Sequence, residues 1–264
     1  MISFSTLIGI CAGIGLFVFA VTSSTDHYII FLSTASLAMV LGSTIAASLI
    51  SFQAAEVMHA IKAMGLSVIT PNTSQKHLQA LIKRFIEWNG IFREGGISAL
   101  EDSLTEKEKK DFFISTSIDL IGSGYKNQEI RMILTDAADA HWQRQTLEAK
   151  ILNTMGVYAP GFGMVGTIVG LIIMLDNMGD DMAGLGKGLA LALITTLYGV
   201  LLAQLLFRPT AAHVTEKQEQ EFYRHQLMIE GFVLLVEKKD AIFMQDRLNA
   251  YVSPSRRYLL QSEI

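Results

Sequence analysis

Long apolar stretches alternate with charged stretches along this chain. Four stretches contain no Lys, Arg, Asp or Glu, namely residues 1–25, 27–55, 151–175 and 188–207. A helix needs about 20 apolar residues to cross the hydrocarbon core of a bilayer, where each backbone amide has to be paired within its own segment. The pattern therefore predicts four transmembrane helices, at 2–21, 28–52, within 151–175 and within 188–207.

The segments between and after these stretches carry helical signals. Thr105 precedes Glu108 with the spacing of a capping box, and Gly122 and Gly124 predict a break before a helix from Asn127 through Gln145. No alternating strand pattern of convincing length occurs. We expect an all-α integral membrane protein with four transmembrane helices and a helical cytoplasmic domain. Its parts are transmembrane helices 1 and 2 (1–52), the cytoplasmic helical domain (53–150), transmembrane helices 3 and 4 (151–207) and a cytoplasmic helical tail (208–264).

Composition agrees with a membrane protein. Half of the 264 residues are hydrophobic and only 17% are charged, against about 25% in a typical soluble domain. The net charge of −4 argues against nucleic acid as a partner, and the single Cys11 excludes an internal disulfide framework. A secretory signal peptide is the alternative for the first stretch. It lacks a basic start, however, and its apolar run is too long, so a retained helix is favoured.

The basic residues indicate the orientation. Residues 51–150 carry 12 of the 21 Lys and Arg residues and the tail from Arg208 carries 8, whereas the connections 22–27 and 176–185 carry none. The positive-inside rule then places the middle segment, the tail and both termini in the cytoplasm.

Hydroxyl groups are the informative polar groups within the predicted spans. Thr167, Thr195 and Thr196 can each bond a carbonyl one turn back, or they can line an ion path together. No predicted span contains an internal Asp, Glu, Lys or Arg, so a partner would have to supply the carboxylate of such a path.

Glycines in the third stretch predict close helix packing. Gly163, Gly166 and Gly170 are the small residues expected at this interface. The match of residues 161–166 to GxGxxG is accidental, because a dinucleotide site needs a preceding strand and a βαβ unit. No catalytic constellation is present, so we do not expect an enzyme, and we expect no cofactor.

Several motifs resemble those of the MotA/PomA family, the A subunits of bacterial flagellar stators. They are Tyr158-Ala-Pro-Gly-Phe-Gly-Met-Val-Gly-Thr-Ile-Val-Gly-Leu171, Gly188-Leu-Ala-Leu-Ala-Leu-Ile-Thr-Thr-Leu-Tyr-Gly199, Val40-Leu-Gly-Ser-Thr-Ile-Ala-Ala47, Phe92-Arg-Glu-Gly-Gly96 with Glu101, Ile229-Glu-Gly231 and Arg247-Leu-Asn-Ala-Tyr251. Ser43 replaces the family's usual second Gly, and Lys238-Lys-Asp-Ala241 replaces its Gly-Asn-Pro stretch.

The resemblance implies a subunit of an ion-driven motor in the bacterial inner membrane. A homo-oligomeric ring, a pentamer, would surround a dimer of a B subunit. That B subunit has one span, binds peptidoglycan and carries the ion-accepting Asp. The cytoplasmic loop would push on the rotor switch protein of the C-ring. The alternative is a related ion-driven transducer of the ExbB/TolQ type that is coupled to a non-flagellar machine.

Site residues follow from the same motifs. Arg93 and Glu101 match the charged pair that engages the rotor, and Glu94 and Asp102 belong to the same patch. Pro160 and Pro209 match two family prolines and are expected to couple ion occupancy to motion. Thr at positions 167 and 196 resembles the sodium-type pattern, so we expect transported sodium, bound transiently near these two residues, with the proton as the alternative.

Overall fold

The computed structural model describes residues 4–66, 75–178 and 182–259, and no strand occurs in these ranges. The prediction of an all-α fold is therefore confirmed. The chain divides into two compact units, one formed by residues 1–70 and 145–216 and the other by residues 71–144 and 217–264. We call them the first unit and the second unit. Helices α7 (Asn127–Asp176) and α9 (Arg208–Val236) contribute residues to both.

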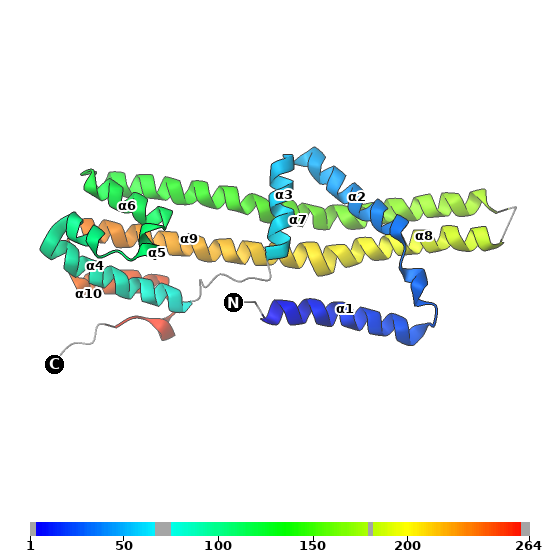
Figure 1. Ribbon diagram of the computed structural model, residues 1–264, viewed down its shortest axis with the longest axis horizontal. Coiled ribbons are helices and arrows are strands. Elements are labelled where there is room, and N and C mark those ends of the chain that lie inside the picture. The colour runs from blue at the N-terminus through cyan, green and yellow to red at the C-terminus, as the bar shows by residue number, and fades with distance from the viewer. Residues whose placement is uncertain (1–3, 67–74, 179–181, 260–264) are drawn as a thin grey trace. The chain divides into compact units, whose positions relative to one another are not determined.

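The first unit holds the helices whose apolar stretches are longest. In addition to parts of α7 and α9, it contains α1 (Phe4–Ser24), the 3-10 helix η1 (Tyr28–Phe31), α2 (Thr34–Ser51), α3 (Ala54–Leu66), α8 (Met182–Leu201) and the π-helical η2 (Leu202–Phe207). Within this unit α8 lies alongside the C-terminal half of α7, and α2 packs on α8 (Figure 1). Its core includes Val40, Met155 and Phe207, which are almost fully buried.

Three stretches are long and apolar enough to cross a membrane. They are Tyr28–Ser51 and parts of Asn127–Asp176 and Gly184–Val236, as judged over the described residues. Within α1, only Cys11–Ser24 counts as an apolar stretch among the residues described in full, and it is too short to cross a membrane, so the first predicted span stays a prediction.

Two predicted helix boundaries are wrong. The helix expected over 28–52 is interrupted, because Leu32 and Ser33 are extended and the α-helix starts only at Thr34. The Ser33 side chain accepts a hydrogen bond from the Ser36 amide and so caps α2. The helix expected to end at Gln145 continues to Asp176. No Gly or Pro follows Gln145 for ten residues, so nothing in the local sequence stops it.

The second unit is built around aromatic side chains. Its remaining elements are α4 (Gln75–Asp102), α5 (Glu106–Lys109), α6 (Phe112–Gly122), α10 (Ala241–Leu248), η3 (Asn249–Tyr251) and η4 (Pro254–Arg256). The Phe85 ring packs edge-on against Trp88 and Phe232, with centroids 5.1 and 5.0 Å away. A Cβ on Gly231 would lie 2.6 Å from the Phe85 ring, so only glycine fits beside this cluster.

The expected capping box and chain break are both present. Thr105 accepts from the Glu108 amide, and Glu108 accepts from the Thr105 amide. The helix that they cap is short and ends at Lys109, and Asp111 caps the next one. The break at Gly122 to Gly124 is confirmed, because α6 ends at Gly122 and Gly124 has a positive φ of 78°.

Candidate functional site

Helices α7 and α8 approach each other closely through small residues. A Cβ built on Gly170 would lie 2.5 Å from the Ala192 amide nitrogen, and one on Gly166 would lie 2.5 Å from the Thr195 Cβ. A Cβ on Gly163 would lie 3.0 Å from the Thr195 carbonyl oxygen. The structure thus places all three glycines that the sequence singles out where the two helices leave no room for a side chain.

Two threonines meet across this interface. The Thr167 and Thr196 hydroxyl oxygens are 2.5 Å apart. Both hydroxyl oxygens also lie 3.2 Å from the Gly163 carbonyl oxygen, and the Thr167 hydroxyl oxygen lies 3.0 Å from the Ala192 carbonyl oxygen. Four oxygen atoms from α7 and α8 therefore gather in one place between apolar helices.

The Thr195 side chain points in a different direction from that of Thr196. Its hydroxyl donates to the Leu191 and Ala192 carbonyls of its own helix at 3.0 Å, and the residue is fully buried against Gly166. Adjacent residues on a helix point about 100° apart, so Thr195 and Thr196 cannot both face Thr167 in the same way. The structure brings together two of the three predicted hydroxyl groups and leaves Thr195 in a packing position.

The two prolines lie in continuous helical backbone. Pro160 is inside α7, where a Cβ on Gly199 of α8 would approach its Cα to 3.1 Å. Pro209 is the second residue of α9 and directly follows the π-helical turn of η2. There the Arg208 amide donates to the Ala203 carbonyl five residues back. This wider turn accommodates the missing donor and the ring of Pro209.

The predicted rotor-interaction residues all belong to α4. Arg93, Glu94, Glu101 and Asp102 are exposed. Gly96 interrupts the helix between the two pairs with φ 70° and ψ −158°, a conformation that L side chains rarely adopt. The kink therefore sets the direction of one charged pair relative to the other.

Sequence reasoning missed a buried carboxylate in the second unit. Glu230 has a side chain that is 5% exposed, and it accepts from Arg131 at 2.9 Å and from Arg247 at 2.7 Å. Burial raises the pKa of this carboxyl, but the two arginine hydrogen bonds outweigh burial and hold the pKa below its ordinary value. The available signal was a single charge inside the apolar run 227–236.

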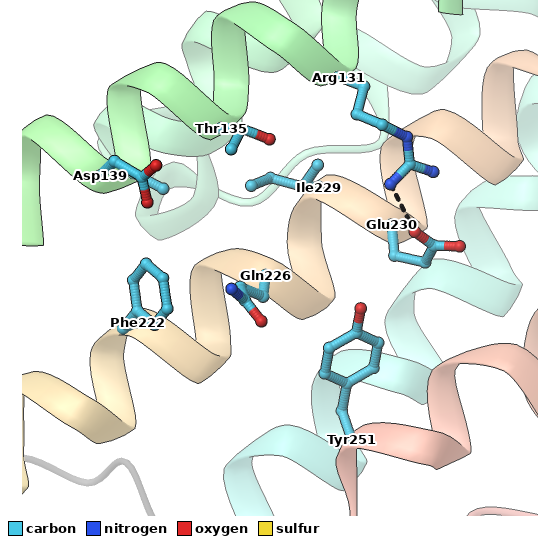
Figure 2. A pocket seen from close by; sticks show the side chains of 9 residues that line it. Arg131, Thr135, Asp139, Phe222, Gln226, Ile229, Glu230 and Tyr251 are labelled. Carbon is cyan, nitrogen blue, oxygen red and sulfur yellow. Dashed lines mark hydrogen bonds and ion pairs between the residues drawn. The ribbon is translucent and has the colours of Figure 1, made fainter. Parts of the chain in front are cut away.

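Glu230 lines a pocket of about 220 Å³ between α7 and α9. Figure 2 shows Arg131, Thr135 and Asp139 entering it from α7, with Tyr251 of η3 below them. Burial, followed by the negative charge of Glu230, raises the pKa of the Tyr251 hydroxyl. The Arg131–Glu230–Arg247 group joins α7, α9 and α10, and Arg131 and Glu230 of this group line the pocket.

A second ion pair, between α9 and the start of α6, lies in the same unit. The Arg224 guanidinium donates to Asp111, which also caps α6 through the Phe113 and Ile114 amides. Burial raises the Asp111 pKa, but the hydrogen bond from Arg224 and its positive charge bring it below its usual value. No group of three or more His, Cys, Asp or Glu side chains that could hold a metal ion occurs among the residues that the structure describes.

Comparison with known proteins points in one direction. Residues 105–226 match the profile of the MotA/TolQ/ExbB proton channel family. The chain is 32% identical over 223 residues to YtxD of Bacillus subtilis, covering 84% of this chain and 80% of that protein. It is 28% identical over 255 residues to the chemotaxis protein PomA of Vibrio alginolyticus, covering 97% of each. The structure of the flagellar MotAB stator complex from B. subtilis has a similar chain, with a TM-score of 0.80, 25% identity and coverage of 95% and 96%.

Proposed function

The chain belongs to the MotA/PomA family of the MotA/TolQ/ExbB group, and on this premise we propose that it is the A subunit of an ion-driven flagellar stator. The similar complex from B. subtilis is described as a flagellar MotAB stator, which supports a B subunit as the partner. The proposed assembly is a pentameric ring of this chain around two B subunits in the bacterial inner membrane, with both termini in the cytoplasm. The activity is ion transport coupled to motion, and no catalytic residue is assigned.

The Thr167–Thr196 pair is the observation that carries this proposal. Its hydroxyl and carbonyl oxygens lie between two tightly packed helices, and the predicted spans contain no internal Asp, Glu, Lys or Arg. Hydroxyl and carbonyl oxygens can bind a cation, but they do not ionise near neutral pH and so do not hold a transported proton as a carboxylate does. In the proposed complex, this chain supplies an oxygen-lined path and the B subunit supplies the carboxylate.

We propose sodium as the driving ion. Hard cations prefer oxygen ligands, and the pair offers two hydroxyl oxygens beside the Gly163 and Ala192 carbonyls. A proton would need only the carboxylate of the partner. An ExbB/TolQ-type transducer remains the alternative function, and the exposed charges of α4 favour the flagellar one because rim charges suit a transient rotor contact.

The prolines complete the proposed mechanism. Pro160 lies against Gly199, and Gly199 is three residues after Thr196 on α8. Pro209 follows the π-helical turn at the end of the predicted fourth span. A helix that lacks a backbone hydrogen bond at these two points bends there more easily. Ion occupancy at the threonine pair would in this way move the cytoplasmic part of α9.

The deciding experiment is motility rescue in a bacterium that lacks its own stators. This chain and its B subunit are co-expressed, and swimming speed is titrated against sodium at fixed pH. We expect rescue that requires sodium. No rescue would contradict the flagellar function, whereas rescue without sodium dependence would contradict only the choice of ion.

Thr196→Ala tests the ion path in the same assay. We expect it to abolish rotation or to raise the sodium requirement by about tenfold, the effect of roughly 1.4 kcal/mol. Thr196→Ser keeps the hydroxyl and should restore most of the function. Thr44→Ala is the matched control, because the Thr44 hydroxyl bonds only the Val40 carbonyl of its own helix in the described structure. Wild-type sodium dependence in Thr196→Ala would rule out the proposed path.

A further inference from the structure

The second apolar stretch contains a break that hydrocarbon should not tolerate. Between η1 and α2, Leu32 and Ser33 are extended, with φ and ψ of −100° and 90° and of −115° and 109°. This break lies inside the stretch Tyr28–Ser51, which is long and apolar enough to cross a membrane. Irregular backbone at such a place needs partners for its amides and carbonyls from elsewhere in the protein.

One side chain supplies partners on both sides of this break. The Tyr198 hydroxyl of α8 accepts from the Ser33 amide at 3.1 Å and donates to the Phe31 carbonyl at 2.5 Å. The Ser33 side chain accepts in turn from the amide and the hydroxyl of Ser36. A single phenol therefore pairs one amide and one carbonyl at the break between η1 and α2.

Tyr198 also lies next to the proposed ion path. It follows Thr196 by two residues, and the next residue, Gly199, would place a Cβ 2.6 Å from the Ala159 carbonyl oxygen of α7. One turn of α8 thus touches the Thr167 hydroxyl, the Pro160 region and the break before α2. A shift of α2 at its N-terminus acts on this turn through the Tyr198 hydroxyl.

We propose that Tyr198 is a positioning residue for ion passage. Its hydroxyl fixes the start of α2 to α8 and thereby sets the position of Thr196 opposite Thr167. This inference rests on the proposed stator function. It adds to that function a specific link between α2 and the ion path. It also explains how α2 of the first unit can be preceded by an extended pair of residues.

A second tyrosine offers a matched control. The Tyr158 hydroxyl of α7 lies 2.9 Å from the Ser51 hydroxyl at the opposite end of α2, in an exposed position. Tyr158→Phe and Tyr198→Phe each remove one hydroxyl oxygen at an end of α2, the first bonded to the Ser51 side chain and the second to backbone groups of Phe31 and Ser33. Only Tyr198→Phe leaves backbone groups of an apolar stretch without their partner.

The test uses the full complex with its B subunit. Hydrogen exchange is measured over residues 31–36, and the rotation-speed step that one stator unit adds to a tethered motor is recorded. For Tyr198→Phe we expect the Ser33 amide to exchange about tenfold faster, corresponding to about 1.4 kcal/mol, and the speed step to fall markedly. Tyr158→Phe should leave both at wild-type values. Fewer stator units per motor would be the sign of a merely structural defect, whereas the step per unit reports ion-driven work.

Each outcome decides a different part of the inference. Unchanged exchange in Tyr198→Phe overturns the hydrogen-bonded link itself. Faster exchange with a wild-type speed step overturns the coupling to ion passage. A wild-type complex that drives no rotation overturns the proposed function and the coupling with it, while the exchange measurement still decides whether Tyr198 holds α2.

Discussion

Burial gives His225 a proton affinity unlike that of an exposed histidine. The residue is 8% exposed, its ring stacks on Phe113 with centroids 4.6 Å apart, and His141 packs edge-on against it. Burial, followed by the positive charge of Arg224, lowers the pKa of His225 to about 4. Glu221 and Asp111 oppose this shift but do not reverse it. A neutral imidazole is thus part of the packed second unit at neutral pH.

The thermal stability of the second unit should fall as the pH drops from about 6.5 to about 4. In this window the unfolded chain protonates His225 at its ordinary pKa of about 6.5, while the folded chain does not. The stabilisation is complete above pH 6.5 and is lost on acidification. His225→Phe should reduce the fall in melting temperature across this window, leaving the smaller fall near pH 4 that the carboxylates of Asp111 and Glu230 cause, whereas a neutral replacement of the exposed His77 should not reduce it. Melting curves of the purified complex at a series of pH values provide the measurement, and an unchanged slope in His225→Phe would refute the assignment.

At the scale of elements, the close packing of α7 against α8 depends on glycines, which have no side chain. Gly170 and Gly188 face each other, since a Cβ on either would come within 2.8 Å of the other's carbonyl oxygen. Backbone atoms cannot yield as the end of a flexible side chain can. The glycines therefore allow the close approach of the two helices, without which the Thr167 and Thr196 hydroxyl oxygens could not lie 2.5 Å apart.

Gly170→Ala should separate α7 from α8. A Cβ at position 170 would meet the Ala192 nitrogen at 2.5 Å, and overpacking of a tight interface costs about 1–3 kcal/mol. We expect a lower melting temperature and loss of rotation. Gly161→Ala on the same helix has nothing within 4 Å, so it should keep wild-type stability and gain slightly from its better helix propensity. Equal melting temperatures for the two variants would show that the helices are not in close contact.

At the scale of the whole molecule, the proposed rotor contact depends on charges that the fold leaves exposed. Arg93 and Glu101 lie on either side of the Gly96 kink and are open to a partner. Charges at the rim of an interface steer association and permit quick release, as a motor that steps repeatedly along a rotor requires. The same charges contribute little to folding, because exposed ion pairs are worth little.

Arg93→Glu should therefore impair rotation without impairing assembly. We expect rotor engagement to weaken by about tenfold, the effect of roughly 1.4 kcal/mol, with normal complex levels in the membrane. Motor speed and membrane abundance are measured together. Lys83→Glu is the control, because it makes the same charge change on α4 at a residue whose side chain is 60% exposed and pairs only weakly with Glu87 at 4.0 Å. Equal loss in both variants would indicate a general charge effect rather than a contact site.

The sequence predicted the helical fold well where composition is decisive. Charge-free stretches such as 188–207 have to pair their backbone internally, and that requirement leaves only a helix. The ends of helices were predicted less well, because the apolar pattern does not reveal where a cap such as Ser33 starts a helix or that α7 runs on past Gln145. The membrane orientation rests on the basic residues alone and stays a prediction.

The sequence by itself thus determined the all-α class, the apolar stretches, the glycine-rich interface and the candidate hydroxyl groups. Only the tertiary structure decided which hydroxyl groups meet, with Thr196 facing Thr167 and Thr195 turned into its own helix. It also decided that Tyr198 reaches the Phe31 carbonyl and that Glu230 is held by two arginines. The physical reason is sequence separation. Phe31 and Tyr198 are 167 residues apart, and a hydrogen bond over that distance along the chain depends on helix packing rather than on the local hydrophobic pattern.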